Sequence, residues 1–585
     1  MKASDFLVNF LILNKIDKVF GYIGGAVAHI YDSISKNPNL EIINGIHEQG
    51  SAFAAEGYAR VTGKSGVVIA TSGPGATNLI TTIGSCYFDS IPLLCITGQV
   101  NTYEFNYNKI SRQIGFQETD IVEIVKPITK YAVMVNKIED LRYELEKAYY
   151  ISHFQRKGPV LVDIPMNIQR SEFDFDQAKS FFKTKEYLNM QNYYITSNNL
   201  SIKQIKHIAS KISKAKSPIV LVGGGVRNSN ACEILDFFLK KYNLPVVHSL
   251  MGKDAIESGF ELNLGLIGSY GNRCANLALA NSDVILVLGS RLDTRQTGTD
   301  LKLFAKNSEI IQVDIDNNEL GKKILTKIQI SSDIKLFLDE LIKQKIQCKC
   351  IQWRNWVKNI IKTLPNNKDI YGNIKIENFL ISIISKKTKA PIFCIDVGQH
   401  QMWAAQALSV LKNTRILFSG GMGAMGFSLP CAIGACIASN QPVVVIVGDG
   451  GLQMNIQELE VIKRRNLPIK IFIFNNENLG MVRQFQEIYF DKNYIGTIKD
   501  YSAPNFESVA KAYGIQSRTI ENLNIFDQIS DEIFSNNQPE VVNILLNNKL
   551  TNVEPKLIVG KPIEDMYPFI EKSKLKELMF LKNKD

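Results

Sequence analysis

Two apolar runs, Pro442-Val-Val-Val-Ile-Val447 and Ile471-Phe-Ile-Phe474, each lead directly into polar residues. Gly448-Asp449-Gly450 follows the first run, and Asn475-Asn476 follows the second. Runs of this length and composition are typical of buried strands in a parallel sheet, and the pattern from about Gln457 to Arg465 predicts a crossover helix between them. Both polar groups should therefore lie at the carboxyl edge of one parallel sheet, where open α/β folds bind ligands.

The side chains at this edge are suited to a metal ion and a diphosphate. The Asp449 carboxylate and the Asn476 amide, together with two phosphate oxygens, make the hard-oxygen site that Mg²⁺ prefers. Gly450 and Gly451 leave room for a diphosphate to approach the backbone at a helix N-terminus. The spacing resembles the diphosphate motif of thiamine-diphosphate enzymes, so we expect thiamine diphosphate and Mg²⁺ as cofactors.

Bulk composition describes an ordinary globular protein. The 585 residues are 45% hydrophobic and 21% charged, which favours three to four domains. The formal charge of +10 comes from evenly spread lysines, so we expect no nucleic-acid partner. Nine scattered cysteines without zinc spacing indicate reduced thiols and a cytoplasmic protein. We expect Phe6–Leu13 to belong to a first helix rather than a signal peptide, and no membrane span.

Three blocks of the chain share one pattern of short apolar strands, glycine turns and amphipathic helices. This alternation predicts three parallel-sheet α/β domains, which share no visible sequence repeat but could share a topology. Polar segments rich in Lys, Gln, Asn or aromatic residues separate the blocks. The first and last strands predicted for the three blocks are residues 65–70 and 159–164, 218–222 and 310–316, and 391–395 and 541–545.

A nucleotide-binding fingerprint offers an alternative. Gly421-Met-Gly-Ala-Met-Gly426 fits G-x-G-x-x-G and precedes a helical pattern, and Asp449 stands near the place of a ribose-binding acid. This favours an NAD-dependent dehydrogenase. However, a ribose-binding acid needs neither the following Gly450-Gly451 nor Asn475-Asn476, so we prefer the metal–diphosphate interpretation.

Further motifs place the resemblance in one family. Together they resemble the catalytic subunit of acetolactate synthase (acetohydroxyacid synthase) over nearly the whole chain. The motifs are Gly24-Gly-Ala26, His47-Glu-Gln-Gly50, Ser72–Asn78, Gly115–Asp120, Asp396–Trp403, Gly420–Phe427 and Leu479-Gly-Met-Val482.

The resemblance implies an activity and a domain plan. The expected enzyme is a thiamine-diphosphate-dependent carboligase that decarboxylates pyruvate and transfers the hydroxyethyl (acetyl) unit to a second 2-oxo acid, giving 2-acetolactate for the branched-chain pathway. The expected parts are a pyrimidine-binding domain (1–170), a linker (171–195), a central FAD-binding-type domain (196–342), a linker (343–371), a diphosphate- and Mg-binding domain (372–550) and a C-terminal tail (551–585).

Glu48 is the expected acid beside the aminopyrimidine ring, where a carboxyl group promotes the imino tautomer that removes the thiazolium C2 proton. The surrounding Gly, Ala and Phe residues form an apolar setting that favours the protonated carboxyl as a donor.

The resemblance also implies the remaining site residues. Met425 would hold the cofactor bent, and Asn478 would bind Mg²⁺ through its backbone carbonyl, which makes its side chain dispensable. Arg295 would receive the carboxylate of the second 2-oxo acid. The flavin would be structural rather than redox-active. The full sets are Glu48, Gly25, Gln117, Arg295 and Met481 for catalysis; Gly398, Gln399, His400, Met425, Gly450 and Gly451 for thiamine diphosphate; Asp449, Asn476 and Asn478 for metal; and Gly223, Gly224, Gly225, Arg291, Asp293 and Asp314 for FAD.

In this family, active sites form between subunits, so we expect a homodimer or homotetramer. The sequence does not decide whether a regulatory small subunit is present. Three positions depart from the family pattern: Thr294 replaces an acid, Met166 a lysine and Phe485 a tryptophan. The smaller Phe485 should weaken a preference for 2-oxobutanoate. Arg112–Phe116 and the tail motif 554–565 look like the acetolactate-synthase-like enzymes of surface-polysaccharide clusters, which leaves transfer to a keto-sugar as an alternative.

Overall fold

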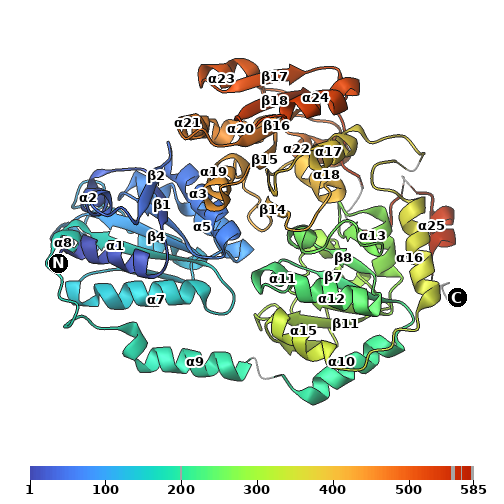
Figure 1. The fold of residues 1–585 in the computed structure, drawn as a ribbon, viewed down its shortest axis with the longest axis horizontal. Coiled ribbons are helices and arrows are strands. Elements are labelled where there is room, and N and C mark those ends of the chain that lie inside the picture. The colour runs from blue at the N-terminus through green and yellow to red at the C-terminus, as the bar shows by residue number, and fades with distance from the viewer. Residues whose placement is uncertain (198–199, 370, 555–559, 568–569, 581–585) are drawn as a thin grey trace.

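The computed structural model contains three parallel sheets, each covered by helices, and so confirms the predicted α/β class (Figure 1). It describes residues 1–197, 200–369, 371–554, 560–567 and 570–580. The predicted strands are present because continuous apolar runs bury both faces of each strand, as in β15 and β16, where every residue is buried.

The first domain has a sheet in the order β2-β1-β3-β4-β6-β5. Its first helix includes the predicted Phe6–Leu13 segment. The strands are β1 Lys18–Gly21, β2 Glu41–Asn44, β3 Gly66–Ala70, β4 Leu93–Gln99, β5 Tyr131–Met134 and β6 Pro159–Pro165. The helices are α1 Ala3–Leu13, α2 Ala28–Ser35, α3 Glu48–Thr62, α4 Pro74–Thr77, α5 Ile80–Asp89, α6 Ile121–Val125, α7 Leu141–His153 and α8 Met166–Arg170.

The central domain has a sheet in the order β12-β11-β10-β7-β8-β9. Its strands are β7 Pro218–Val222, β8 Val246–His248, β9 Asn263–Leu266, β10 Val284–Leu288, β11 Glu309–Asp314 and β12 Ile328–Ser331. Its helices are α10 Ile202–Lys214, α11 Gly225–Asn228, α12 Cys232–Tyr242, α13 Arg273–Ala280, α14 Thr294–Thr297 and α15 Ile334–Ile342.

The third domain has a sheet in the order β14-β13-β15-β16-β18-β17. Its strands are β13 Ile392–Ile395, β14 Arg415–Phe418, β15 Val443–Gly448, β16 Ile469–Asn475, β17 Gln516–Ile520 and β18 Glu540–Leu545. Its helices are α17 Ile376–Lys387, α18 Gln399–Ala407, α19 Ser428–Ser439, α20 Asp449–Met454, α21 Leu459–Arg464, α22 Gly480–Tyr489, α23 Phe506–Ala512 and α24 Phe526–Ile533.

Two of the three domains share a topology. When the strands of each sheet are numbered from one, the first and third domains both have the order 2-1-3-4-6-5, whereas the central domain has 3-2-1-4-5-6. Each order has a switch point, where neighbouring strands send their crossover connections in opposite directions. These points lie between β1 and β3, between β7 and β10, and between β13 and β15, and they are where ligands bind in such sheets.

The crossover between β15 and β16 contains more than the predicted helix. A 3₁₀ turn at Ile456–Glu458 and α21 cover the predicted Gln457–Arg465 segment, and α20 precedes them. The break falls at Asn455, whose backbone is not helical and whose side-chain amide donates to the Gly426 carbonyl oxygen at 2.9 Å. A tertiary contact therefore interrupts a sequence with helical periodicity.

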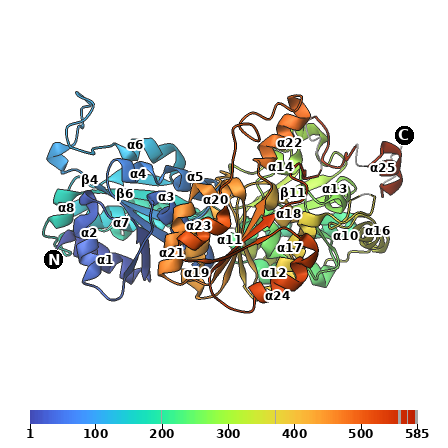
Figure 2. The ribbon, with the colours of Figure 1, turned by 90° about the horizontal axis from the view of Figure 1, so that it is seen from above.

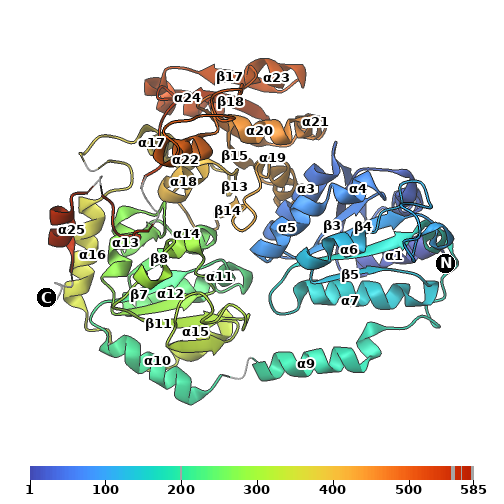
Figure 3. The ribbon, with the colours of Figure 1, turned by 180° about the vertical axis from the view of Figure 1, so that it is seen from behind.

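The two segments expected as linkers contain helices. Most of α9 (Lys185–Ser197) falls in the first linker, and this helix runs below the first domain towards α10 of the central domain. In the second linker, α16 (Ile351–Thr363) packs on the central domain (Figures 1 and 3). In the tail, α25 (Lys572–Leu578) lies against α16, where Trp356 donates to the Leu578 carbonyl oxygen at 3.2 Å. Residues 555–559 of the tail motif lie outside the described residues, and the domain boundaries themselves stay a prediction.

Helices α3 and α19 join the first and third domains, while the central domain lies beside the third (Figures 1 and 2). Glycines allow this close crossing: a Cβ added to Gly57 would lie 2.1 Å from the Cys431 carbonyl oxygen, and one added to Gly434 would lie 1.7 Å from that of Ala54. Within the described part of the chain, no helix combines the length and apolar character needed to cross a membrane.

Candidate active site

The predicted metal ligands lie together at the switch point of the third sheet. Asp449 begins α20 directly after β15, and Asn476 follows β16, the next strand of the sheet. The Asn476 amide donates to Gln399 Oε1 at 3.1 Å, and Gln399 begins α18 after β13. Asp449, Asn476 and Gln399 are all buried.

Burial affects the acid at this site. It raises the pKa of Asp449 to about 6, and the Tyr501 hydroxyl donates to Asp449 Oδ2 at 2.9 Å. Tyr501 was not predicted, because nothing in its local sequence marks it. The described residues contain no group of three His, Cys, Asp or Glu side chains that could hold a metal. A cation here would therefore rely on one carboxylate, amide and carbonyl oxygens, and phosphate oxygens, as a diphosphate-bound Mg²⁺ does.

Unsatisfied polar atoms indicate that this edge fits a polar ligand. His400 Nε2 and Asn478 Oδ1 are buried and have no hydrogen-bond partner. Such atoms are rare in folded proteins unless a ligand, ion or water binds them. Burial lowers the pKa of His400 to about 3, so its imidazole is neutral and carries a single N–H.

The structure modifies two expectations here. The Asn478 side chain, expected to be dispensable, donates to the Asn476 and Lys549 carbonyl oxygens at 2.7 Å each and so bridges two loops. Gly450 and Gly451 have a packing reason in addition to ligand access. A Cβ added to Gly450 would lie 2.5 Å from Leu479, and one added to Gly451 would lie 2.7 Å from Asp396 Oδ1.

Asp396 organises the loop that carries Met425. Its carboxylate accepts from the backbone N–H groups of Gly426 at 2.9 Å and Ser428 at 2.8 Å, and it is completely buried. A Cβ added to Gly450 would lie 3.4 Å from Met425 Cε, which places the methionine beside Gly450. The glycine loop thus belongs to the same edge as Asp449 and Gly398, where the flanking β13 and β15 pair in parallel.

The predicted acid Glu48 lies at the corresponding edge of the first sheet. It begins α3, and the Asn78 amide donates to its Oε2 at 2.9 Å. Gly75 approaches its other oxygen, since an added Cβ would lie 3.1 Å from Oε1. The setting is therefore less apolar than the sequence predicts, because an amide is hydrogen-bonded to the carboxyl group. Gly25 lies at the end of β1, with open space around it.

Gln117 belongs to the loop between β4 and α6 and has a positive φ of 63°. The neighbouring Glu118 holds this loop by accepting from the backbone N–H groups of Asn106, Ile114 and Gly115 at 2.9, 2.7 and 3.1 Å. A Cβ added to Gly73, which follows β3, would lie 3.0 Å from the Gln117 carbonyl oxygen. Gln117 therefore lies at the same edge of the first sheet as Gly25 and Glu48.

The two edges do not meet within the described part of one chain. Among the described residues, no hydrogen bond or ion pair joins Glu48 to Asp449, Asn476 or His400. The first and third domains meet instead beside Glu48, where Glu458 accepts from the backbone N–H groups of Ile46 and His47 at 3.2 Å each. Glu458 was not predicted, because its partners lie more than 400 positions away in the sequence.

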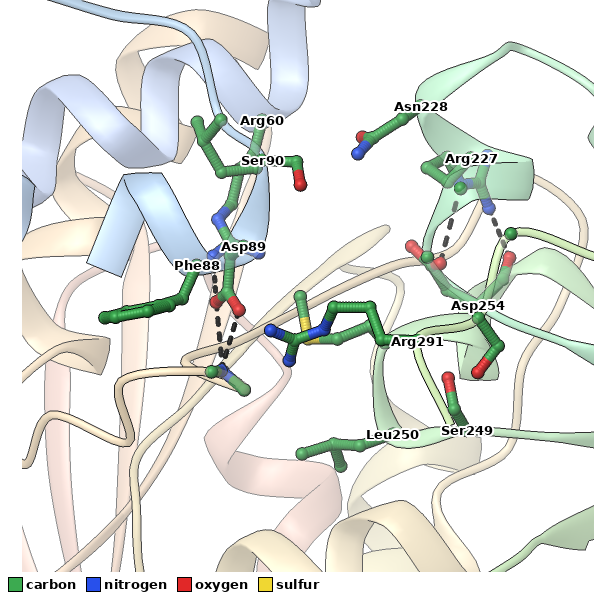
Figure 4. Close-up of a pocket in the computed structure, with 18 of the residues that line it drawn as sticks. Arg60, Phe88, Asp89, Ser90, Arg227, Asn228, Ser249, Leu250, Asp254 and Arg291 are labelled. Carbon is green, nitrogen blue, oxygen red and sulfur yellow. Dashed lines mark hydrogen bonds and ion pairs between the residues drawn. The ribbon is translucent and has the colours of Figure 1, made fainter. Parts of the chain in front are cut away.

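A cavity of about 710 Å³ lies at the switch point of the central sheet, between all three domains. Its lining includes the predicted Gly224, Gly225, Arg291, Asp293 and Asp314. Figure 4 shows Arg60, Asp89 and Ser90 on the first-domain side of this cavity, opposite Arg227, Asp254 and Arg291 of the central domain.

Gly223 lies behind this lining rather than in it, because it packs against β10. A Cβ added to Gly223 would lie 2.1 Å from the Gly289 carbonyl oxygen. Six arginines and six carboxylates line the cavity, and its volume admits a dinucleotide, whose phosphates the arginines would bind. At one end Arg156 pairs with Asp316 at 3.1 Å and Glu319 at 2.8 Å, linking the first and central domains.

Arg295 lies in α14, next to the cavity. Its guanidinium carbon is 5.7 Å from the centre of the Tyr270 ring, within cation–π range. Asp293 accepts from the Arg295 backbone N–H at 3.0 Å and so caps the short helix. Phe485 of α22 lies 47% exposed and packs on Tyr489 with ring centres 4.6 Å apart. Met481, also on α22, packs against the same apolar cluster as Tyr270.

Comparison with known proteins agrees with this geometry. Three descriptions match: "Thiamine pyrophosphate enzyme, N-terminal TPP binding domain" over residues 1–124, "central domain" over 205–341 and "C-terminal TPP binding domain" over 396–544. The acetolactate synthase large subunit of Lactococcus lactis is 36% identical over 563 residues, which cover 94% of this chain and 93% of the relative. The chain belongs to the acetolactate synthase family of thiamine pyrophosphate enzymes.

Other relatives in this family are similarly close. The acetolactate synthase large subunit of Cyanidium caldarium is 35% identical over 96% of this chain and 95% of the relative. The isozyme 2 large subunit of Escherichia coli is 34% identical over 97% of this chain and 99% of the relative. The similarity therefore spans all three sheets, and thiamine pyrophosphate, the other name of thiamine diphosphate, is the cofactor for which both outer domains are named.

Proposed function

We propose that the protein is a thiamine-diphosphate-dependent carboligase that decarboxylates pyruvate and joins the two-carbon unit to a second 2-oxo acid, forming 2-acetolactate. The observation that carries this proposal is the near full-length similarity to acetolactate synthase large subunits. The geometry of the third-sheet edge supports it, because Asp449, Asn476 and Gln399 converge there beside unsatisfied His400. The keto-sugar and dehydrogenase alternatives are not favoured.

The proposed cofactor ligands follow from the edge of the third sheet. Bound thiamine diphosphate supplies a carbon nucleophile that the protein itself lacks. Asp449 and Asn476 would hold Mg²⁺ by their side chains and Asn478 by its backbone carbonyl, while Met425 would support the cofactor. The diphosphate would contact Gly398, Gln399, His400, Gly450 and Gly451.

The first domain supplies the proton chemistry in this proposal. Glu48 donates a proton to the pyrimidine nitrogen, and Asn78 keeps the carboxyl group oriented through its hydrogen bond. Gly25 and Gln117 bound the reaction space on the same side, and Met481 bounds it on the third-domain side. Arg295 receives the carboxylate of the second 2-oxo acid, and Tyr270 holds the guanidinium from below.

The cavity between the domains holds FAD in a structural role. Its volume and arginine-rich lining suit a dinucleotide, and Gly224 and Gly225 leave the backbone accessible to its phosphates. Asp314 ends β11 and lines the cavity, where its carboxylate would be available to hydroxyl groups of the ligand, and Arg291 and Asp293 follow β10.

Two copies of the chain complete each active site in this proposal, because no hydrogen bond or ion pair joins Glu48 to Asp449 within the described part of one chain. Exposed apolar side chains are available in both domains: Tyr22 and Ile23 in the first, and Met454 at the end of α20 in the third. The assembly is therefore a homodimer or homotetramer. Relatives are named large subunits, so a regulatory small subunit is the corresponding partner.

Product analysis tests the function. The purified protein, incubated with pyruvate, thiamine diphosphate and Mg²⁺, should form acetolactate. A parallel incubation with added nucleotide-linked keto-sugar distinguishes the alternative, because exclusive transfer to the sugar without acetolactate would contradict the proposal. Asp449→Ala serves as the control, since it removes the only carboxylate among the proposed metal ligands and should abolish product formation.

A further inference from the structure

The glycine loop between β14 and α19 belongs to two sites at once. Residues 419–423 line the proposed flavin cavity, whereas Met425 lies beside Gly450 at the proposed thiamine diphosphate site. Both sites thus share one segment of only a few residues. Asp396 anchors the loop again at Gly426 and Ser428, so a shift of its first half must be taken up by the residues between the two anchors, and these include Met425.

The start of this loop is held by a residue of another domain. Asp89, the last residue of α5, accepts from the backbone N–H of Gly420 through Oδ2 at 3.0 Å and from that of Gly421 through Oδ1 at 2.7 Å. Figure 4 shows this carboxylate directed at the loop backbone from the first-domain side of the cavity. Two carboxylates, Asp89 and Asp396, therefore fix the two ends of the loop.

Asp89 is itself held in place by a buried ion pair. Arg60 donates to Asp89 Oδ2 at 2.9 Å and to Glu56 Oε1 at 2.6 Å, and side-chain exposure is 1% for Asp89, 4% for Arg60 and 0% for Glu56. The contact also needs glycine: a Cβ added to Gly421 would lie 2.5 Å from Phe88 Cβ and 3.1 Å from Asp89 Oδ1. The Asp89 carboxylate, Arg60 and the absence of a side chain at Gly421 together fix the position of the loop at its start.

We propose that Asp89 is a positioning residue that sets the glycine loop and thereby couples occupancy of the flavin cavity to binding of thiamine diphosphate. FAD in this cavity would contact residues 419–423, the part of the loop that Asp89 fixes, and Met425 follows in the same segment. By thermodynamic linkage, bound FAD then strengthens thiamine diphosphate binding, and bound thiamine diphosphate strengthens FAD binding by the same factor. This inference rests on the proposed function, because that function assigns the two cofactors to these sites.

The test is a pair of binding titrations. The dissociation constant of thiamine diphosphate is measured with Mg²⁺, with and without saturating FAD. In the unchanged protein we expect FAD to tighten binding about tenfold, within the usual range of such couplings. In Asp89→Asn an amide group cannot accept from both N–H groups, so this factor should fall towards one. Thiamine diphosphate binding in the presence of FAD should weaken roughly 10- to 100-fold, the loss expected for a charge-assisted hydrogen bond.

Two further variants separate positioning from general stability. Gly421→Ala leaves the Asp89–Arg60 pair intact but pushes the loop away, so it should reproduce the Asp89→Asn result even if that variant folds poorly. Glu56→Gln makes the same carboxylate-to-amide change in the same ion-pair network without touching the loop, and should keep the tenfold factor.

The outcomes distinguish this inference from the proposed function. If FAD still tightens thiamine diphosphate binding about tenfold in Asp89→Asn and Gly421→Ala, and acetolactate is still formed, the inference is overturned but the proposed function is not. Equal losses in Glu56→Gln and Asp89→Asn would overturn it as well, because they would indicate a structural effect of the ion pair. Failure of the unchanged protein to bind thiamine diphosphate would reject the proposed function and this inference with it.

Discussion

At the scale of single residues, Glu48 has the most specific proposed task. Glu48→Gln should still bind thiamine diphosphate, because the amide keeps the size and hydrogen-bonding shape of the side chain. It cannot relay the proton, so exchange of the cofactor C2 proton should slow roughly 10²–10⁴-fold. Hydrogen–deuterium exchange at C2 of the bound cofactor measures this. Glu56→Gln, the same change in the same helix, is the control, and unchanged exchange in Glu48→Gln would contradict the assigned role.

Phe485 is the residue at which acceptor choice can be tested. It is half-exposed and packs at a tilt on Tyr489, so a larger ring fits at this place without entering the core. The unchanged protein should show little preference for 2-oxobutanoate over pyruvate. Phe485→Trp should raise that preference, by about 10-fold or more for a contact worth 1–3 kcal/mol. The product ratio at equal acceptor concentrations is the measurement, and Tyr489→Phe is the matched control.

At the scale of elements, the crossing of α3 and α19 depends on backbone contact. Gly434→Ala would place a methyl group against the Ala54 carbonyl oxygen, which neither helix can avoid without moving. Overpacking of this kind costs about 1–3 kcal/mol, so the urea midpoint should fall. Ser439→Ala, at the end of the same helix, should change it little. A Gly434→Ala protein as stable as the unchanged one would show that the helices shift freely.

The turn after α20 should give the protein a pH-dependent stability. Burial raises the pKa of Glu458 from 4.5 to about 7, so between these pH values the folded protein binds more protons than the unfolded chain. Stability contributed by this group is therefore lost as pH rises from about 5 to 8, by about 3 kcal/mol. Glu458→Gln mimics the protonated form. Its urea midpoint should match that of the unchanged protein at pH 5 and exceed it at pH 8; equal midpoints at both pH values would contradict the assignment.

At the scale of the whole molecule, the separation of Glu48 from Asp449 predicts that subunits complement each other. Glu48→Gln and Asp449→Ala homo-oligomers should each be nearly inactive. After subunit exchange, a mixed dimer contains one site with both changes and one with neither, so acetolactate formation should recover to about a quarter of the normal rate for random pairing. Mixing either variant with itself is the control. No recovery, despite proven exchange, would mean that each site uses one chain.

The sequence by itself determined the α/β class, the most buried strands of each sheet and the polar cluster at the strand ends of the third. Apolar runs specify buried strands locally, and Asp449 and Asn476 stand within two residues of such runs, so their position at a sheet edge follows from the chain direction alone. Glu48 follows β2, which no apolar run predicted, and was assigned through the family resemblance. The predicted crossover helix over Gln457–Arg465 is present as the 3₁₀ turn and α21, whereas the sequence analysis missed α20, which is separated from that turn at Asn455, where the side chain contacts the glycine loop.

Only the tertiary structure decided how the domains support the sites. The Asp89 contacts with Gly420 and Gly421 span more than 330 sequence positions, and those of Glu458 with Ile46 and His47 span more than 410. Tyr501 reaches Asp449 across 52 positions. Such contacts depend on how whole sheets pack, not on local propensity or periodicity, so the residues that hold the site became visible only in three dimensions.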